Sequence, residues 1–399
     1  MKNKFKKYFI KTFGCQMNEA DSERIAGWYE SKGWELAKDI KEANEVVINT
    51  CSVRESAEHR ARGQINNLAK LKAQGSPASR PRLDSVEDGS PRLPTSSRLG
   101  RGRVGRGRAR LKIILTGCMM RYPLAWLRKN LPVVDEFKKI TEFGTKAEPV
   151  RESKDHAFIS IMEGCNNFCT YCVVPYSRGR EKSRSFEEII CEAEELAKRG
   201  CREITLLGQN VNSYGKDLKI ANSKYQILNM QIKNDQRQFK TPFALLLATL
   251  HGIPGIKKIS FLTSNPWDFD DNIIKAMKFP KIDRYLHLPV QSGDDEVLLR
   301  MNRHYTSGEY LKLIRKIRRA VPEITIGTDI IVGFPGETEK QFQNTVKLCE
   351  KVGFLKAYVA MYSPRSGTVS YKMADDVPYK EKKRRWKILD DLINKKKNR

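Results

Sequence analysis

The chain has 399 residues, 40% of them hydrophobic, which is enough for about two or three domains with their own cores. Its formal net charge of +27 favours a polyanionic partner, most simply nucleic acid, over a merely solvated basic surface. No apolar run is long enough to span a bilayer, and the basic start lacks the apolar stretch of a secretory signal. The sequence therefore indicates a reduced, cytoplasmic protein without membrane association, in which clustered cysteines serve metal or redox chemistry.

The first 150 residues alternate between predicted strands and helices. Strands are expected at residues 7–13, 45–50 and 111–117, and helices at residues 20–32 and 56–72. Such alternation is typical of parallel strands joined by crossover helices. Residues 1–150 are therefore predicted to form a parallel-sheet α/β domain.

Residues 74–110 interrupt this pattern. They are rich in Ser, Pro and Gly, and they contain nine arginines against three acidic residues. This composition offers too little apolar surface to offset the entropy of ordering, so the segment is expected to be disordered. We favour a tolerated surface insertion over an RNA-binding arm.

A second and longer alternation begins near residue 151. Six strands are expected, at residues 157–162, 202–208, 257–263, 284–290, 325–334 and 355–362. Capping-box patterns mark helix starts at Ser185, Thr306 and Thr338. Six consecutive β/α units predict a partial (β/α)6 barrel over residues 151–378, with a long loop at 217–241. Residues 379–399 are expected to form a basic helix and tail.

Three cysteines with C-x3-C-x2-C spacing follow the first predicted barrel strand. In parallel α/β folds, sites lie at the carboxyl ends of strands, which is where Cys165, Cys169 and Cys172 are placed. Structural zinc prefers four ligands, and the nearest histidine, His156, precedes the strand. A four-iron cluster held by three cysteines fits better, because one iron stays open for another ligand. We call these three residues the loop cysteines.

A second set of cysteines is spread over the first domain. Cys15, Cys51 and Cys118 each follow a predicted strand, in "TFGC", "INTC" and "LTGC". The carboxyl ends of parallel strands share one edge of the sheet, so the three side chains are expected to gather there as a second metal site. We call them the sheet-edge cysteines. The remaining three cysteines fit no ligand spacing and are interpreted as packing residues.

Several longer motifs carry a family resemblance. They occur in this order: "TFGCQMNEADS", "VVINTCSVRE", "GCNNFCTYCVVPYSRGRE", "LLGQNVNSYG", "LHLPVQSG", "TDIIVGFPGET" and "MYSPRSGT". Together they resemble the methylthiotransferase branch of the radical S-adenosylmethionine (SAM) enzymes, and within it the MiaB group. The resemblance covers nearly the whole chain outside residues 74–110 and parts of 217–241.

The resemblance implies a reaction and its cofactors. The loop cysteines would hold a [4Fe-4S] cluster that binds and cleaves SAM, releasing a radical that takes hydrogen from C2 of an adenine. The sheet-edge cysteines would hold a second [4Fe-4S] cluster that supplies sulfur, which a second SAM methylates. The substrate would be N6-isopentenyladenosine at position 37 of tRNA, next to the anticodon. Electrons would come from a donor such as flavodoxin or ferredoxin.

Other residues near the barrel strand ends are weaker candidates. Gln291, Ser292 and Asp329 are placed where SAM would bind, and the glycines of "GFPGE", residues 333–337, would bring backbone amides close to it. For each of these positions, simple loop geometry is an equal alternative.

Three arginines flank the loop cysteines. Arg178, Arg180 and Arg184 would meet tRNA phosphate or the SAM carboxylate, or would pair with Glu181 and Glu187. The sequence leaves both readings open.

The chain departs from the resemblance at its end. Members of the group usually finish in a small basic β-barrel, the TRAM domain, and no strand-like run follows residue 394, so this domain is expected to be absent. The basic tail would then contact phosphates in part. Alternative functions are methylthiolation of threonylcarbamoyl-adenosine in tRNA or of a ribosomal-protein aspartate, a metal-stabilised RNA-binding protein, and an inactive truncated copy.

Overall fold

The computed structural model describes residues 6–52, 55–74, 111–144, 148–218 and 239–395. Almost all of the segment expected to be disordered and most of the loop expected at 217–241 lie outside the described residues, so both expectations stay predictions. No helix in the described ranges is long and apolar enough to cross a membrane.

Five parallel strands form the first sheet, in the order β2, β1, β3, β4, β5. Their bounds in that order are Glu35–Leu36, Lys7–Phe13, Glu45–Thr50, Lys112–Gly117 and Glu136–Phe137. The three predicted strands are confirmed. The edge strands β2 and β5 escaped prediction because two residues carry no alternation of apolar and polar side chains.

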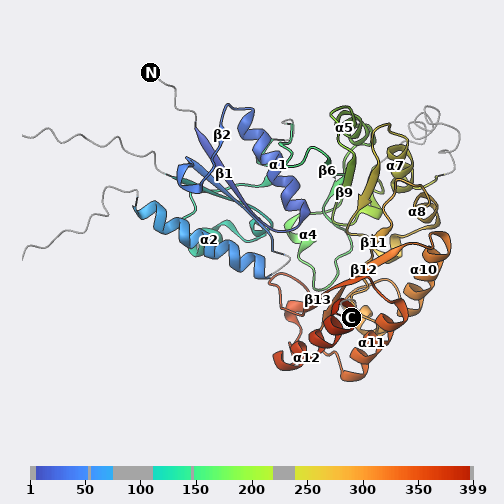
Figure 1. Ribbon diagram of the computed structural model, residues 1–399. Coiled ribbons are helices and arrows are strands. Elements are labelled where there is room, and N and C mark those ends of the chain that lie inside the picture. The colour runs from blue at the N-terminus through green and yellow to red at the C-terminus, as the bar shows by residue number, and fades with distance from the viewer. Residues whose placement is uncertain (1–5, 53–54, 75–110, 145–147, 219–238, 396–399) are drawn as a thin grey trace, which may run out of the picture.

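Helices cover both faces of this sheet (Figure 1). Successive residues of a strand point to opposite faces, so Val46 packs with α2 (Glu55–Gln74) and α3 (Leu124–Asn130), whereas Val47 packs with α1 (Gln16–Glu30). Coverage on both faces explains why these strands read as nearly continuous apolar runs.

Six parallel strands in chain order form the second unit. They are β6 (His156–Ser160), β9 (Glu203–Leu207), β10 (Lys258–Phe261), β11 (Tyr285–His287), β12 (Thr325–Val332) and β13 (Lys356–Met361). Strands β10 and β11 are joined by fewer backbone hydrogen bonds than the other neighbouring strands, through the segment just before β11. The Ile259 amide donates to the Lys281 carbonyl at 2.7 Å, and the Asp283 amide donates to the Ile259 carbonyl at 2.9 Å. The predicted (β/α)6 partial barrel is thereby confirmed.

The barrel helices lie outside the strands (Figure 1). They are α5 (Phe186–Lys198), α7 (Pro242–His251), α8 (Asp271–Ala276), α9 (Asp295–Arg300), α10 (Ser307–Ala320), α11 (Glu339–Val352) and α12 (Tyr379–Asp390). Thr306 and Thr338 close both halves of their predicted capping boxes, and Ser185 caps α5 by accepting from the Glu188 amide at 3.2 Å.

Helix α12 continues as a π-helix over Asp391–Lys395 and packs on the last two barrel strands. The Trp386 indole donates to the Val359 carbonyl at 3.0 Å, which ties α12 to β13. The basic C-terminal helix therefore lies in the helix layer of the barrel. The domain limits placed at residues 150 and 378 stay predictions.

Candidate metal centres

The loop cysteines lie between β7 (Met162–Glu163) and the short helix α4 (Val174–Ser177). Gly164 opens the loop with a φ of +78°, and a Cβ there would lie 2.0 Å from the Arg180 carbonyl oxygen, so only glycine fits. The Cys165 amide donates to the Gly179 carbonyl at 3.1 Å, which closes the loop on itself. The backbone thus holds the three thiols in one short, folded segment.

Burial dominates the electrostatics of two of these thiols. It raises the pKa of Cys165 to about 12 and also raises the pKa of Cys172. A buried cation faces them, because Arg303 Nη1 lies 3.6 Å from Cys169 Sγ and its guanidinium stacks over the Trp267 ring at 4.7 Å. Buried cysteine side chains beside an arginine suit a bound metal group that would hold them as thiolates.

The sheet-edge cysteines follow three adjacent strands. Phe13 of β1 pairs with Thr50 of β3, and Thr50 pairs with Gly117 of β4. Cys51 and Cys118 directly follow the paired residues of β3 and β4, and Cys15 follows β1 after one glycine. The register therefore places all three at the same carboxyl edge of the sheet, where the sequence pattern put them.

Buried asparagines hold this edge together. Asn18 donates to the Thr50 carbonyl and to Asn49 Oδ1, both at 3.1 Å, and its own Oδ1 accepts from the Cys15 amide at 3.3 Å. These contacts fasten the start of α1 to the end of β3. Asn18 was missed from sequence, although it lies one helical turn beyond Cys15.

Cys118 is the thiol most disposed to ionise. A hydrogen bond from the Cys51 side chain and the nearby Arg178 guanidinium lower the pKa of Cys118 to about 5. A thiolate with a neighbouring thiol and an arginine is a donor set that fits an iron–sulfur group. Across the described part of the chain, no three His, Cys, Asp or Glu side chains converge closely enough to hold a single metal ion. Three thiolates of a four-iron cluster each bind a different iron and stand farther apart, so a cluster is the group that these cysteine sets would hold.

Two of the three flanking arginines pair with carboxylates that the sequence did not suggest. Arg178 is buried and pairs with Asp21 of α1 at 2.6 Å, and Arg184 pairs with Glu192 at 2.7 Å. The Arg180 guanidinium lies 4.3 Å from the centre of the Phe168 ring. The alternative of pairing with Glu181 and Glu187 is therefore wrong for Arg178 and Arg184, because the docking of α1 and the turn of α5 bring other carboxylates closer.

Of the three residues considered for SAM binding, Gln291 has a polar atom free for a ligand, whereas Asp329 and Ser292 contact other side chains of the chain. Gln291 has a φ of +66°, and its buried Oε1 has no hydrogen-bond partner among the described residues, as a ligand-binding amide would. The Asp329 side chain is partly exposed, and its Oδ2 lies 3.0 Å from His287 Nε2. Ser292 is fully buried, and its hydroxyl lies 3.3 Å from that of Thr345 in α11. Ser292 thus contacts the helix layer.

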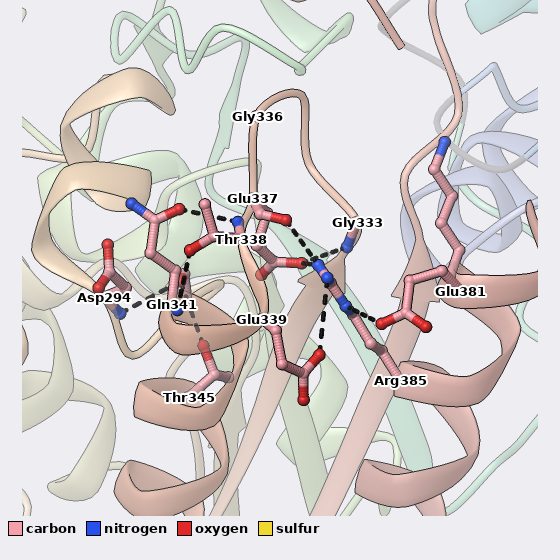
Figure 2. Close-up of polar contacts among 12 residues, drawn as sticks. Asp294, Gly333, Gly336, Glu337, Thr338, Glu339, Gln341, Thr345, Glu381 and Arg385 are labelled. Carbon is pink, nitrogen blue, oxygen red and sulfur yellow. Dashed lines mark hydrogen bonds and ion pairs between the residues drawn. The ribbon is translucent and has the colours of Figure 1, made fainter. Parts of the chain in front are cut away.

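The "GFPGE" loop after β12 uses its amides internally (Figure 2). The Gly333 amide donates to Glu337 Oε2 at 2.6 Å, and the Gly336 amide donates to Asp376 Oδ1 at 2.7 Å. Arg385 of α12 holds the same Glu337 oxygen at 2.8 Å. The expectation that these two glycine amides face a ligand is therefore wrong, since carboxylates of this chain already occupy them.

The comparisons with known proteins agree with this geometry. Residues 159–349 match the radical SAM superfamily, and residues 7–79 match an uncharacterized family, UPF0004. The solved structures of the radical SAM methyltransferase TsrM from Kitasatospora setae and of the radical enzyme OxsB share the fold. TsrM aligns with a TM-score of 0.50 at 13% identity, covering 90% of this chain and 75% of that one. OxsB aligns with a TM-score of 0.51 at 9% identity, covering 99% and 56%.

A partial barrel with three cysteines after its first strand, within a radical SAM match, defines a radical SAM enzyme. Curated relatives narrow the class. A protein of Dehalococcoides mccartyi is 41% identical over 96% of this chain and 82% of its own length, and one of Thermotoga petrophila is 41% identical over 98% and 83%. Both are named tRNA-2-methylthio-N(6)-dimethylallyladenosine synthase. The chain belongs to this methylthiotransferase family, so the alternative of a non-enzymatic RNA-binding protein does not stand.

Proposed function

We propose that this protein methylthiolates C2 of N6-isopentenyladenosine at position 37 of tRNA. The observation that carries the proposal is a contact between the segments that carry the two cysteine sets. Helix α4, which directly follows the loop cysteines, packs against the turn Cys118–Arg121 at the sheet edge. A reaction that must activate a ring carbon and deliver sulfur to it needs both functions beside one atom. The names of the curated relatives support the same substrate.

The residues present fit two iron–sulfur clusters and SAM. When bound, these groups would supply a carbon-centred radical from SAM and a sulfur atom for transfer, with a second SAM as methyl donor. The loop cysteines would hold the first cluster, and the sheet-edge cysteines the second. Arg303 would balance the negative charge of the first site, and Gln291 would hydrogen-bond to SAM.

The chain's own residues would also hold the RNA. Lys380, Lys383 and Lys387 are exposed on α12, and the net charge of +27 favours binding to phosphate. A cytoplasmic location and an electron donor such as flavodoxin or ferredoxin belong to the same proposal, since folded tRNA and low-potential electrons must both reach the site.

Expression in a bacterial strain that lacks its own tRNA methylthiotransferase tests the proposal. Mass spectrometry of tRNA nucleosides should show methylthio-isopentenyladenosine with the native chain and with the control C191A, whose cysteine is exposed on α5. Neither C169A nor C51A should produce it. Purified C169A should not cleave SAM, whereas C51A should cleave SAM without inserting sulfur.

Two outcomes contradict the proposal. Methylthiolation by C51A would exclude a sulfur-supplying role for the sheet-edge cysteines. A native chain that modifies threonylcarbamoyl-adenosine, while leaving isopentenyladenosine unchanged, would assign the activity to the neighbouring tRNA substrate.

A further inference from the structure

A chain of charges, buried at Asp21 and Arg178, links helix α1 to both ends of the loop-cysteine segment. Asp21 is fully buried between two arginines, with Arg178 Nη2 2.6 Å from Oδ2 and Arg24 Nη2 2.5 Å from Oδ1. Arg24 also lies 3.0 Å from Glu163, which precedes Cys165 by two residues. One carboxylate of the first domain therefore fastens the segment before the loop cysteines and the segment after them.

The other side of Arg178 faces the sheet edge. Arg178 directly follows α4, which packs against the turn Cys118–Arg121, and only 8% of its side chain is exposed. The positive charge of its guanidinium acts on the Cys118 side chain as well as on Asp21. A guanidinium buried to this degree does not meet RNA phosphate in solution. Its burial is offset by the carboxylate of Asp21.

We propose that Arg178 is a positioning residue that tunes the second metal centre. Asp21 holds its guanidinium at the sheet edge beside Cys118. Positive charge there would favour the more negative, reduced state of a cluster bound by the sheet-edge cysteines. Hydrogen bonds to cluster sulfurs and nearby charge are the protein's means of setting such potentials. The inference rests on the proposed role of the sheet-edge cysteines.

A purely structural role makes a different prediction. If Arg178 only clamps the two domains together, its loss lowers stability and leaves the potential of a bound cluster unchanged. If it acts on the cluster, the potential follows the charge and the donor at residue 178, and lysine, which keeps the charge, restores it in part.

The experiment uses the full-length chain with all three loop cysteines replaced by alanine, so that only the second site can bind a cluster. The protein is reconstituted anaerobically with ferrous iron and sulfide, and the midpoint potential is measured by redox titration with electron paramagnetic resonance. R178Q and R178K are compared in this background with R184Q, an arginine of the same segment that pairs with Glu192 instead.

R178Q should shift the midpoint to a more negative potential, R178K should shift it less, and R184Q should not shift it. An unchanged potential in R178Q, with the cluster bound, overturns the inference and leaves the proposed function standing. Failure of the parent background to bind iron overturns the second metal site itself, and with it both proposals.

Discussion

Loss of the Arg385 guanidinium should destabilise the barrel far more than loss of its neighbour in α12. Arg385 and Glu337 are 5% and 1% exposed in their side chains, and Nη1 lies 2.8 Å from Oε2 (Figure 2). In R385M the Glu337 carboxylate would keep the Gly333 amide as a donor but would lose its buried counter-ion. Glu337 would then be an uncompensated charge in the barrel wall.

The burial of the Arg385–Glu337 pair determines how much unfolding free energy R385M should lose. Removing one partner of a buried ion pair costs about 3–5 kcal/mol of unfolding free energy. Arg384, whose side chain is 45% exposed, pairs with Glu339 and Glu381 at the surface, where such pairs contribute about 0–1 kcal/mol. R384M is therefore the matched control. E337Q should cost less than R385M, because Arg385 would still pair with Glu381 at 2.7 Å.

Urea unfolding followed by circular dichroism and tryptophan fluorescence measures these differences. Trp386 is a useful reporter, since its indole donates to a carbonyl of β13. The double variant E337Q/R385M should lose less than the sum of the single losses, because no buried carboxylate then remains unpaired. If R385M loses no more unfolding free energy than R384M, then Arg385 does not neutralise a buried charge on Glu337.

Three further predictions concern the two sites and the last helix. Gly117 has a φ of +86°, and a Cβ would lie 2.3 Å from a backbone oxygen of β3, so G117A should lower the iron content of the second site, measured after reconstitution with iron and sulfide. Hydrogen bonds from Arg384 and then Arg385 lower the pKa of Glu381 to about 2 from 4.5. This stabilisation is present above pH 4.5 and is lost as the pH falls toward 2, so the gap in melting temperature between the native chain and E381Q should close over that range. Gln291→Asn tolerates the positive φ but shortens the amide, and it should weaken SAM binding in equilibrium dialysis without changing iron content. Native SAM affinity in this variant would remove Gln291 from the site.

The strands and the cysteine placements could be predicted because local pattern and topology determine them. Each buried parallel strand is a short apolar run, and the carboxyl ends of adjacent parallel strands share one edge. Once the strands before Cys15, Cys51 and Cys118 are identified, their common edge follows. Nothing about the docking of the two domains is needed for that step.

The partners of single side chains could not be predicted in the same way. Arg178 pairs with Asp21, which lies far away in the sequence, whereas sequence reasoning considered only the nearby acids. Ser292 sits at a strand end, but the positive φ of Gln291 turns the chain so that the hydroxyl meets Thr345. Both outcomes depend on how elements dock, which no local pattern reports.

Helix α1 is the element on which the alignment of the two sites depends. It begins directly after Cys15 and carries Asp21, and on the same helix Met17 packs with Leu207 of the barrel. Glu23 pairs with Arg151 at 2.8 Å, which fixes the far half of the helix to the segment entering β6. A rotation of α1 would move a sheet-edge cysteine and the anchor of Arg178 together, so the spacing between the cysteine sets depends on this helix. The proposed mechanism requires both sites at one substrate atom. Substitutions in the α1–barrel contact should therefore impair sulfur insertion before they impair SAM cleavage.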